Sequence, residues 1–313
     1  MIVMPEYVQD IINDENLAWN KSVEKNTEKF LIKLSKASIE ELERNISNKD
    51  FSNSKSPILK NEIHGLKNKF LNKGIGFFII DGKVFATFSK EEMRHIYEII
   101  SKCLGSLYVQ NIHKEKFVEI KDSGKTMAKG GRYHQTKEGG SYHTDSPQWE
   151  DVPDYIGLFC VRPAKEGGVS KFVSTYTIHN EILKKDERYL KCLYEKFYFD
   201  KRGEYEKGES PTVNEPVFKI VEGELRCRYL RNYIDEGHLI ENSPLTKEQI
   251  SALDVFDRFS KKEENIVDYD LKINDMLFFN NHRILHGRSS FEDFEDEELK
   301  RLMIRAWIKD EEV

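Results

Sequence analysis

A succession of short strand-like segments sets the strongest limit on how this chain can fold. The segments are apolar, or alternate apolar with polar residues, and turn-forming Gly, Pro or Asn-Asp residues separate many of them. Because the expected helices are few and concentrated, the pattern predicts a mainly β-fold, a sandwich or barrel with flanking helices, and not a series of βαβ units. The predicted strands cover residues 74–82, 154–161, 169–174, 216–221, 225–231, 265–271, 276–279, 283–288 and 299–309.

The first 73 residues differ from the rest of the chain. Between residues 15 and 73, apolar side chains recur at three- and four-residue spacing among Lys and Glu, interrupted by a loop over 47–57. We expect residues 1–73 to form a helical extension packed on the core, and residues 74–313 to form a single domain. No residue of the extension carries an evident chemical function.

Three later helices are also expected. Capping-box sequences at Ser89 and Thr246 predict the starts of two of them. A third is expected over about 175–199, with Thr175 or Thr177 as its N-cap.

Charge and cysteine content narrow the classes of partner. The chain has 49 basic and 55 acidic residues, net −6, without a basic block, so a nucleic-acid partner is not expected. No window approaches the roughly 18 apolar residues of a membrane span. The default partner is a small molecule, and the oligomeric state stays open. The four cysteines are scattered singly without a secretory signal, which favours a reducing, cytoplasmic location over a disulfide framework or a structural zinc: Cys103, Cys160, Cys192 and Cys227.

The segment Ser141–Ser146 offers two ligands for a metal ion. In an extended strand, His143 and Asp145 point to the same face while Thr144 points away. One more histidine would complete the two-histidine, one-carboxylate triad of a non-haem Fe(II) oxygenase. The triplet alone is also compatible with a capping Asp beside a partly buried His.

Two candidates exist for the third ligand, His282 and His286. A zinc-protease helix would need Glu beside the first histidine, and Arg283 stands there. In a strand both histidines share a face, but only one can reach the depth of the other ligands. We prefer His286, because Gly287 after it would let a bulky cofactor approach the backbone, and we expect His282 to support the site or the core.

The closing strand predicts a binding site for anions. Its period of two places Arg301, Met303, Arg305 and Trp307 on one face. Buried arginines need anions, and Cα atoms about 13 Å apart suit two different ones. A strand at the protein surface is the alternative.

The metal site also predicts a cosubstrate. Two histidines and a carboxylate leave coordination positions on the metal for a 2-oxo acid and O2. The far carboxylate of 2-oxoglutarate would need an arginine and a hydroxyl, roles that fit Arg301 and Ser170.

These motifs together resemble the taurine dioxygenase and clavaminate synthase-like family of Fe(II)/2-oxoglutarate oxygenases. The resemblance covers about residues 74–307 and rests on His143-Thr144-Asp145, Gly167-Gly168-Val169-Ser170, Asp275-Met276-Leu277-Phe278-Phe279, Leu285-His286-Gly287-Arg288 and Arg301-Leu302-Met303-Ile304-Arg305. It implies a double-stranded β-helix (jelly-roll) core. It also implies that His143, Asp145 and His286 hold iron, that Ser170 and Arg301 bind 2-oxoglutarate, and that Arg305 meets an acidic group of the substrate.

The expected reaction is hydroxylation of an unactivated C–H in an amino acid or related small acid. Desaturation or ring formation would use the same residues, whereas halogenation would need a small residue in place of Asp145. A non-catalytic metal- or ligand-binding β-helix protein and a zinc hydrolase are alternatives from other classes. Tyr142, Gln148 and Trp149 are expected to line the substrate pocket, and the charged segment 200–214 forms either a lid over it or a solvent-exposed loop.

Overall fold

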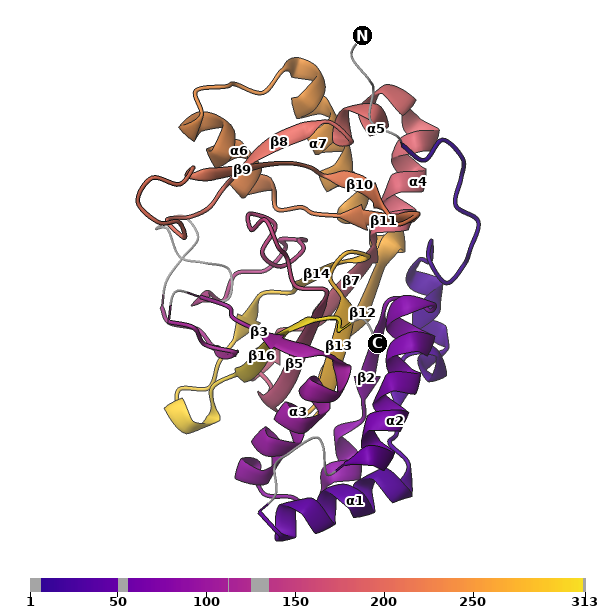
Figure 1. The fold of residues 1–313 in the computed structure, drawn as a ribbon, viewed down its shortest axis with the longest axis vertical. Helices are drawn as coiled ribbons and strands as arrows, with labels where there is room; N and C mark the ends of the chain where they lie inside the picture. The colour runs from indigo at the N-terminus through magenta and orange to yellow at the C-terminus, as the bar shows by residue number, and fades with distance from the viewer. Residues whose placement is uncertain (1–6, 50–55, 112, 125–134, 312–313) are drawn as a thin grey trace.

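The computed structural model describes residues 7–49, 56–111, 113–124 and 135–311, and two β-sheets form its centre (Figure 1). The seven-stranded sheet has the order β1-β2-β13-β5-β16-β3, with β4 also paired to β16, and the three-stranded sheet has the order β12-β7-β14. Their strands are β1 (Leu31–Ile32), β2 (Phe77–Ile80), β3 (Ser106–Tyr108), β4 (Phe117–Ile120), β5 (Tyr155–Arg162), β7 (Ser170–Ser174), β12 (Ile266–Tyr269), β13 (Met276–Asn280), β14 (Ile284–Arg288) and β16 (Leu302–Lys309).

Strand β2 shows why the larger sheet is apolar on both faces. Phe77 packs toward the smaller sheet, where its ring stacks on Phe172 of β7 with 4.8 Å between centroids. The alternate residues Phe78 and Ile80 join a separate cluster formed with helices of the amino-terminal half. A strand covered on both faces can consist of apolar residues without alternation. The residues of β2, Phe-Phe-Ile-Ile, are such a run.

Helices α1 (Lys36–Ser47), α2 (Pro57–Leu66) and α3 (Lys90–Leu104) supply that second cluster (Figure 1). Helix α2 continues as a π-helical turn, η4 (Lys67–Asn72). The capping box predicted before α3 is confirmed, because the Ser89 hydroxyl accepts from the Glu92 backbone N–H and the Glu92 carboxylate accepts from the Ser89 backbone N–H.

The helical prediction for residues 15–73 is only partly right. Ahead of α1 the chain forms short 3₁₀ turns, η1 (Lys21–Lys25) and η2 (Thr27–Lys29), and then β1, which pairs in parallel with β2. Leu31 lies opposite Ile79 in that pairing, so the extension adds an edge strand to the large sheet. Sheet pairing here overrides the local helical spacing.

A second group of helices and hairpins lies beyond the smaller sheet (Figure 1). It contains α4 (Thr175–Lys185), α5 (Glu187–Leu193), α6 (Arg231–Ile240) and α7 (Lys247–Ser260), with the hairpins β8 (Lys196–Asp200)–β9 (Thr212–Pro216) and β10 (Phe218–Val221)–β11 (Glu224–Cys227). Shorter elements are η5 (Gly82–Phe85), η8 (Glu263–Asn265), η9 (Glu297–Leu299) and the pair β6 (Glu166–Gly167)–β15 (Phe291–Glu292).

Two predictions for this group are wrong and one is confirmed. The single helix expected over 175–199 is instead α4, α5 and strand β8, and its N-cap is Ser174, whose hydroxyl accepts from the Thr177 backbone N–H. The predicted strand over 225–231 ends at Cys227, and Arg231 already begins α6. The capping box at Thr246 is confirmed. The architecture is therefore mixed α/β with substantial sheet content. None of the helices in the described residues has the length and apolarity to cross a membrane.

Candidate active site

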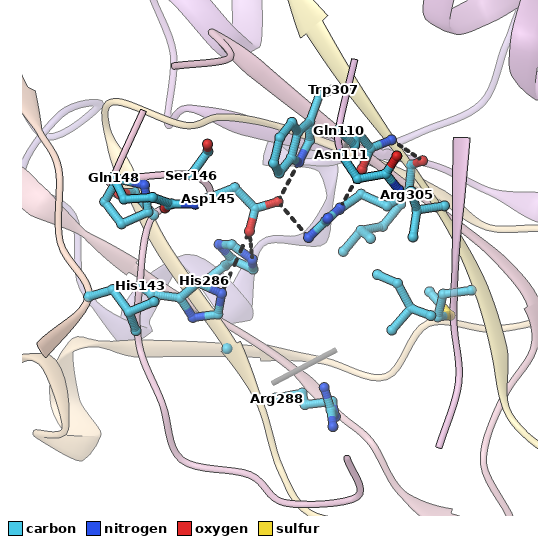
Figure 2. A pocket seen from close by; sticks show the side chains of 18 of the residues that line it. Gln110, Asn111, His143, Asp145, Ser146, Gln148, His286, Arg288, Arg305 and Trp307 are labelled. Atoms are coloured by element: carbon cyan, nitrogen blue, oxygen red, sulfur yellow. Dashed lines mark hydrogen bonds and ion pairs between the residues drawn. The ribbon is translucent and has the colours of Figure 1, made fainter. Parts of the chain in front are cut away.

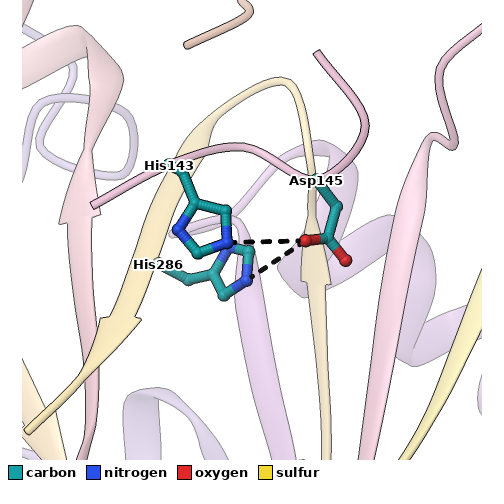
Figure 3. A group of neighbouring side chains, drawn as sticks. All are labelled: His143, Asp145 and His286. Carbon is teal, nitrogen blue, oxygen red and sulfur yellow. Dashed lines mark ion pairs between the residues drawn. The ribbon is translucent and has the colours of Figure 1, made fainter. Parts of the chain in front are cut away.

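The side chains of His143 and His286 lie beside each other (Figure 3). A reciprocal pair of backbone hydrogen bonds holds the two residues in this position. The His143 N–H donates to the His286 carbonyl at 3.0 Å, and the His286 N–H donates to the His143 carbonyl at 2.9 Å. The two imidazole rings consequently lie 4.3 Å apart between centroids, and Phe279 packs against the His286 ring at 4.6 Å. The sequence thus brings together two ligands that are far apart along the chain.

Asp145 completes a group of three candidate metal ligands. Its Oδ1 lies 3.6 Å from Nε2 of His143 and 3.6 Å from Nε2 of His286. All three ligand atoms lie within 4.8 Å of one another, and no other such group of three His, Cys, Asp or Glu occurs in the described residues. Donors about 2.1 Å from one ion at right angles are about 3 Å apart, so a small closure would fit a divalent metal.

The strand β16 orients the Asp145 carboxylate (Figure 2). Its Oδ2 accepts a hydrogen bond from Trp307 Nε1 at 2.7 Å and pairs with Arg305 Nη1 at 3.1 Å. Oδ2 is therefore held toward β16 while Oδ1 faces the imidazoles. A carboxylate with one oxygen anchored and the other directed at two histidines is arranged as a metal ligand.

The protonation states also suit a metal. Burial alone would raise the pKa of Asp145, but Arg305 and the hydrogen bond with His143 hold it well below its usual value. Burial, together with neighbouring His143, lowers the pKa of His286 to about 3. The carboxylate is therefore ionised and the His286 imidazole is neutral at pH 7, which are the forms that bind a divalent cation.

Two residues that the sequence pattern did not reveal hold the His-Thr-Asp backbone. The Thr144 N–H donates to the Tyr229 carbonyl at 3.0 Å, and the Tyr229 N–H donates to the Thr144 hydroxyl at 3.0 Å. Asn281 Oδ1 accepts from the Asp145 N–H at 2.8 Å, and its Nδ2 donates back to the Asp145 carbonyl at 3.0 Å. These partners are remote in sequence, so no local motif could identify them.

His282 and Gly287 both have roles other than that of a metal ligand. His282 Nε2 lies 2.9 Å from Asp154 Oδ1, so this histidine belongs to a separate polar network. Gly287 lines the cavity beside the candidate metal ligands, so the expectation that a cofactor approaches its backbone stays a prediction, and the glycine also has a structural role. A Cβ at this position would lie 2.6 Å from the Ser141 carbonyl oxygen, so the glycine allows the two backbones to pass.

A cavity of about 160 Å³ opens beside the three ligands (Figure 2). The alternation predicted for the closing strand is confirmed, because Arg301, Met303, Arg305 and Trp307 all line it. Ser170 lines it from β7, and its partner in the sheet register, Arg288 of β14, contributes a third arginine. Arg305 Nε also donates to Gln110 Oε1 at 2.7 Å.

Of the three residues expected to contact substrate, one lines the cavity and two do not. Gln148 lines the cavity. Tyr142 does not, because it is adjacent to His143 and lies on the opposite side, in the core cluster with Tyr229. Trp149 lies behind the wall, where its ring meets Trp307 edge-to-face at 5.2 Å.

The charged segment 200–214 is a loop only over residues 201–211, because its ends belong to β8 and β9. Glu204 of this loop lines the cavity. Its Oε2 accepts from Gln148 Nε2 at 3.2 Å and from Trp149 Nε1 at 2.9 Å. The loop is thus attached to the cavity wall, a contact that an unpatterned charged sequence does not predict.

The odd spacing of Arg228 and Arg231 in the predicted strand 225–231 allows at most one of them to face inward and favours solvent exposure of both. For Arg228 this expectation is wrong. Arg228 is 7% exposed, and its Nη1 donates to the carbonyls of Pro147 and Trp149 at 3.0 and 2.8 Å. Arg231 forms ion pairs with three aspartates of α6 and α7: Asp235, Asp254 and Asp257.

Comparison with known proteins agrees with this geometry. Residues 38–307 match the family described as taurine catabolism dioxygenase TauD, TfdA family. FR-33289 synthase of Streptomyces rubellomurinus is 30% identical over 243 residues, which is 76% of this chain and 70% of that protein. The taurine hydroxylase-like protein SAT17 of Stachybotrys chartarum is 26% identical over 176 residues, 55% of this chain and 43% of that protein.

Solved structures show the same fold at low identity. A crystal structure of asparagine oxygenase with Fe(II), 2S,3S-3-hydroxyasparagine and succinate has a TM-score of 0.68 at 12% identity, covering 90% of this chain and 93% of that one. The non-haem iron oxygenase OrfP with Fe and α-ketoglutaric acid has a TM-score of 0.61 at 14% identity, covering 90% and 94%. The family match extends over most of the chain and includes all three ligands, so this chain belongs to the TauD, TfdA family and is an Fe(II)- and 2-oxoglutarate-dependent dioxygenase.

Proposed function

We propose that His143, Asp145 and His286 hold Fe(II), and that the adjoining cavity oxidises an unactivated C–H of an amino acid or related small acid, with hydroxylation as the outcome. The observation that carries this proposal is the convergence of the three ligand atoms within 4.8 Å at a cavity lined by three arginines. Iron bound with 2-oxoglutarate and O2 supplies an oxidant for C–H cleavage, while 2-oxoglutarate becomes succinate and CO2. Desaturation or ring closure would use the same residues.

Arg301 and Ser170 are the residues we assign to 2-oxoglutarate. Both are buried side chains that line the cavity, Arg301 just before β16 and Ser170 at the start of β7. A guanidinium in a partly desolvated cavity is suited to bidentate recognition of a carboxylate. The Ser170 hydroxyl can donate one further hydrogen bond to the same group.

Arg305 is the residue we assign to an acidic group of the substrate. Its Nε and Nη1 are occupied by Gln110 and Asp145, which leaves Nη2 for a ligand in the cavity. Arg305 thereby has a second role, because the same side chain anchors the carboxylate proposed to hold iron. An amino-acid substrate is supported by the structural neighbours, since the asparagine oxygenase and OrfP structures contain hydroxyasparagine and hydroxyarginine.

We further propose that loop 201–211 closes the substrate side of the cavity through Glu204. The Glu204 carboxylate bridges the Gln148 amide and the Trp149 indole, so the loop and the wall form one surface. Release of these two hydrogen bonds would open the cavity to solvent. Glu204 also adds a negative charge at a site otherwise rich in arginine.

We infer that the two facing sheets constitute a double-stranded β-helix core, with residues 1–73 as an extension and residues 74–313 as the catalytic domain. Its support is the shared cluster between the sheets, in which Phe77, Phe172 and Phe279 meet. We place the protein in the cytoplasm, because all four cysteines are buried free thiols.

The test is succinate formation from 2-oxoglutarate by the full chain with added Fe(II), across a panel of amino acids and related acids. We expect stimulation by the correct substrate and a product that has gained one oxygen atom. Asp145→Ala should abolish turnover, and the matched control Asp235→Ala, which removes a carboxylate outside the cavity lining, should retain it. Succinate formation that is equal in wild type and Asp145→Ala would refute the proposed iron site.

A further inference from the structure

A second cavity, of about 100 Å³, borders the segment that supplies Gln148 to the catalytic cavity. None of its lining residues belongs to the three-ligand group or to the lining of the catalytic cavity. Four of them are cations, Lys219, Arg226, Arg228 and Lys309, and three are acidic, Glu150, Asp151 and Asp154. His282 also lines the cavity, and burial lowers its pKa so that the imidazole is neutral. This concentration of cations needs a physical explanation.

Three of the cations lie on one face of the hairpin β10–β11. Lys219 and Arg226 are direct partners in the antiparallel register, and Arg228 is two residues further along the same face. The opposite face is apolar, with Leu225 and Cys227 buried in the core. Like charges directly opposite each other destabilise a β-pair. A hairpin that places both charges toward a cavity therefore needs a counter-charge there.

The aspartates of the cavity do not supply that counter-charge. Asp154 is occupied by His282 at 2.9 Å and Lys309 at 3.1 Å, and Asp151 also pairs with Lys309, at 2.7 Å. The remaining acid, Glu150, is exposed to solvent. The two aspartates are thus paired with Lys309 and His282, and neither forms an ion pair with a hairpin cation.

The hairpin cations have weaker compensation. Lys219 has one ion pair with Glu215, at 3.3 Å. The Arg226 guanidinium forms neither a hydrogen bond nor an ion pair with any residue that the structure describes. Arg228 is buried, and its side-chain hydrogen bonds both use Nη1 and go to uncharged carbonyls. Burial accordingly lowers the pKa of Arg228. Glu215 offsets this lowering only in part, and the same carboxylate is the ion-pair partner of Lys219, so one acid serves two buried or half-buried cations.

We propose that this second cavity is a binding site for a small oxyanion of the phosphate class, held by Lys219, Arg226 and Arg228. Two guanidinium groups and an ammonium can donate several charge-assisted hydrogen bonds to a tetrahedral oxyanion. Arg228 also holds the Pro147 and Trp149 carbonyls, so the bound anion would stabilise the wall that carries Gln148. The site is independent of the iron chemistry proposed above.

The test is calorimetric titration of the metal-free full chain with inorganic phosphate. Arg226→Gln removes a guanidinium that has no hydrogen bond or ion pair with the described residues, so the fold should persist, which circular dichroism can verify. We expect this variant to bind phosphate at least about tenfold more weakly, because a charge-assisted hydrogen bond is lost. Arg226→Lys should recover part of the affinity.

Two control variants separate this site from other sources of phosphate binding. Arg258→Gln, which removes an exposed charge on α7, should bind phosphate like wild type. Arg301→Gln, which alters the catalytic cavity, should do the same. The proposal is overturned if wild type does not bind phosphate, if Arg226→Gln binds it unchanged, or if Arg301→Gln is the variant that loses it. The last result would place the anion in the catalytic cavity.

Discussion

Trp307→Phe should weaken iron binding without removing any ligand. The Trp307 indole N–H donates to Asp145 Oδ2 at 2.7 Å, and the tryptophan is buried. Phenylalanine keeps an aromatic ring in the cavity wall but has no donor. The Asp145 carboxylate would then lose one of the two contacts that hold Oδ2 toward β16 and leave Oδ1 facing both imidazoles.

The size of the effect follows from what remains. A hydrogen bond to a charged group contributes about 1.5–3 kcal/mol, and partners of metal ligands typically change metal affinity by about 10- to 100-fold. Arg305 Nη1 still holds the same oxygen at 3.1 Å in the variant. We therefore expect the lower end of this range, about a tenfold rise in the Kd for Fe(II), which corresponds to about 1.4 kcal/mol.

The assay is anaerobic titration with Fe(II) at saturating 2-oxoglutarate, followed by the visible charge-transfer band of the complex. The matched control is Trp149→Phe, the same change in the neighbouring tryptophan, whose indole N–H donates to Glu204 instead. Iron affinity should be unchanged in this control. Wild-type affinity in Trp307→Phe would refute the reasoning, and an equal loss in both variants would show that ring packing, not the hydrogen bond, matters.

Three further predictions concern the remaining groups. Arg301→Ala should raise the KM for 2-oxoglutarate roughly thirtyfold or more, since removing one partner of a desolvated charged contact costs about 2–5 kcal/mol, and an unchanged KM in steady-state assays would exclude this role. His286→Ala should abolish the charge-transfer band while His282→Ala retains it, and the reverse pattern would make His282 the ligand. Burial raises the pKa of Asp154, but hydrogen bonds from His282 and the Asp310 N–H outweigh this effect and lower the pKa to about 2. Asp154 therefore stabilises the fold above about pH 4. This contribution is lost as the pH falls toward 2. Urea unfolding should therefore show Asp154→Asn less stable by about 2 kcal/mol at pH 7, with the difference narrowing in acid; a pH-independent difference would contradict this.

Local patterns predicted the parts of the site that lie close together in sequence. The His143–Asp145 spacing and the alternation along β16 depend only on the period of an extended strand, and the structure has both on the expected faces. The backbone pair between His143 and His286, two segments far apart in the sequence, decides that His286 and not His282 lies beside His143. The sequence favoured His286 but contains no local signal for that pairing.

The errors arose where tertiary contacts decide between two local patterns. Leu190, Leu193 and Phe197 keep helical spacing, yet the chain has left the helix before Phe197, which pairs with Glu215 in the β8–β9 hairpin. The same limit applies to Arg228, whose burial depends on carbonyls about eighty residues earlier in the chain. Neither the strand propensity nor the charge of a single residue indicates which distant residues it will contact in the fold.

The position of strand β16 determines where three side chains of the site lie: Trp307, Arg305 and Arg301. β16 is hydrogen-bonded to β5 on one side and to β3 and β4 on the other, so it is not an edge and its register cannot shift without breaking two sets of pairs. Trp307 and Arg305 on this strand orient Asp145, and Arg301, on the same face just before the strand begins, lines the cavity where 2-oxoglutarate is proposed to bind. A shift of one residue would turn all three side chains out of the cavity together. The pairing of β16 thus sets the distance between the proposed iron site and Arg301 and Arg305, the two arginines proposed to bind anions.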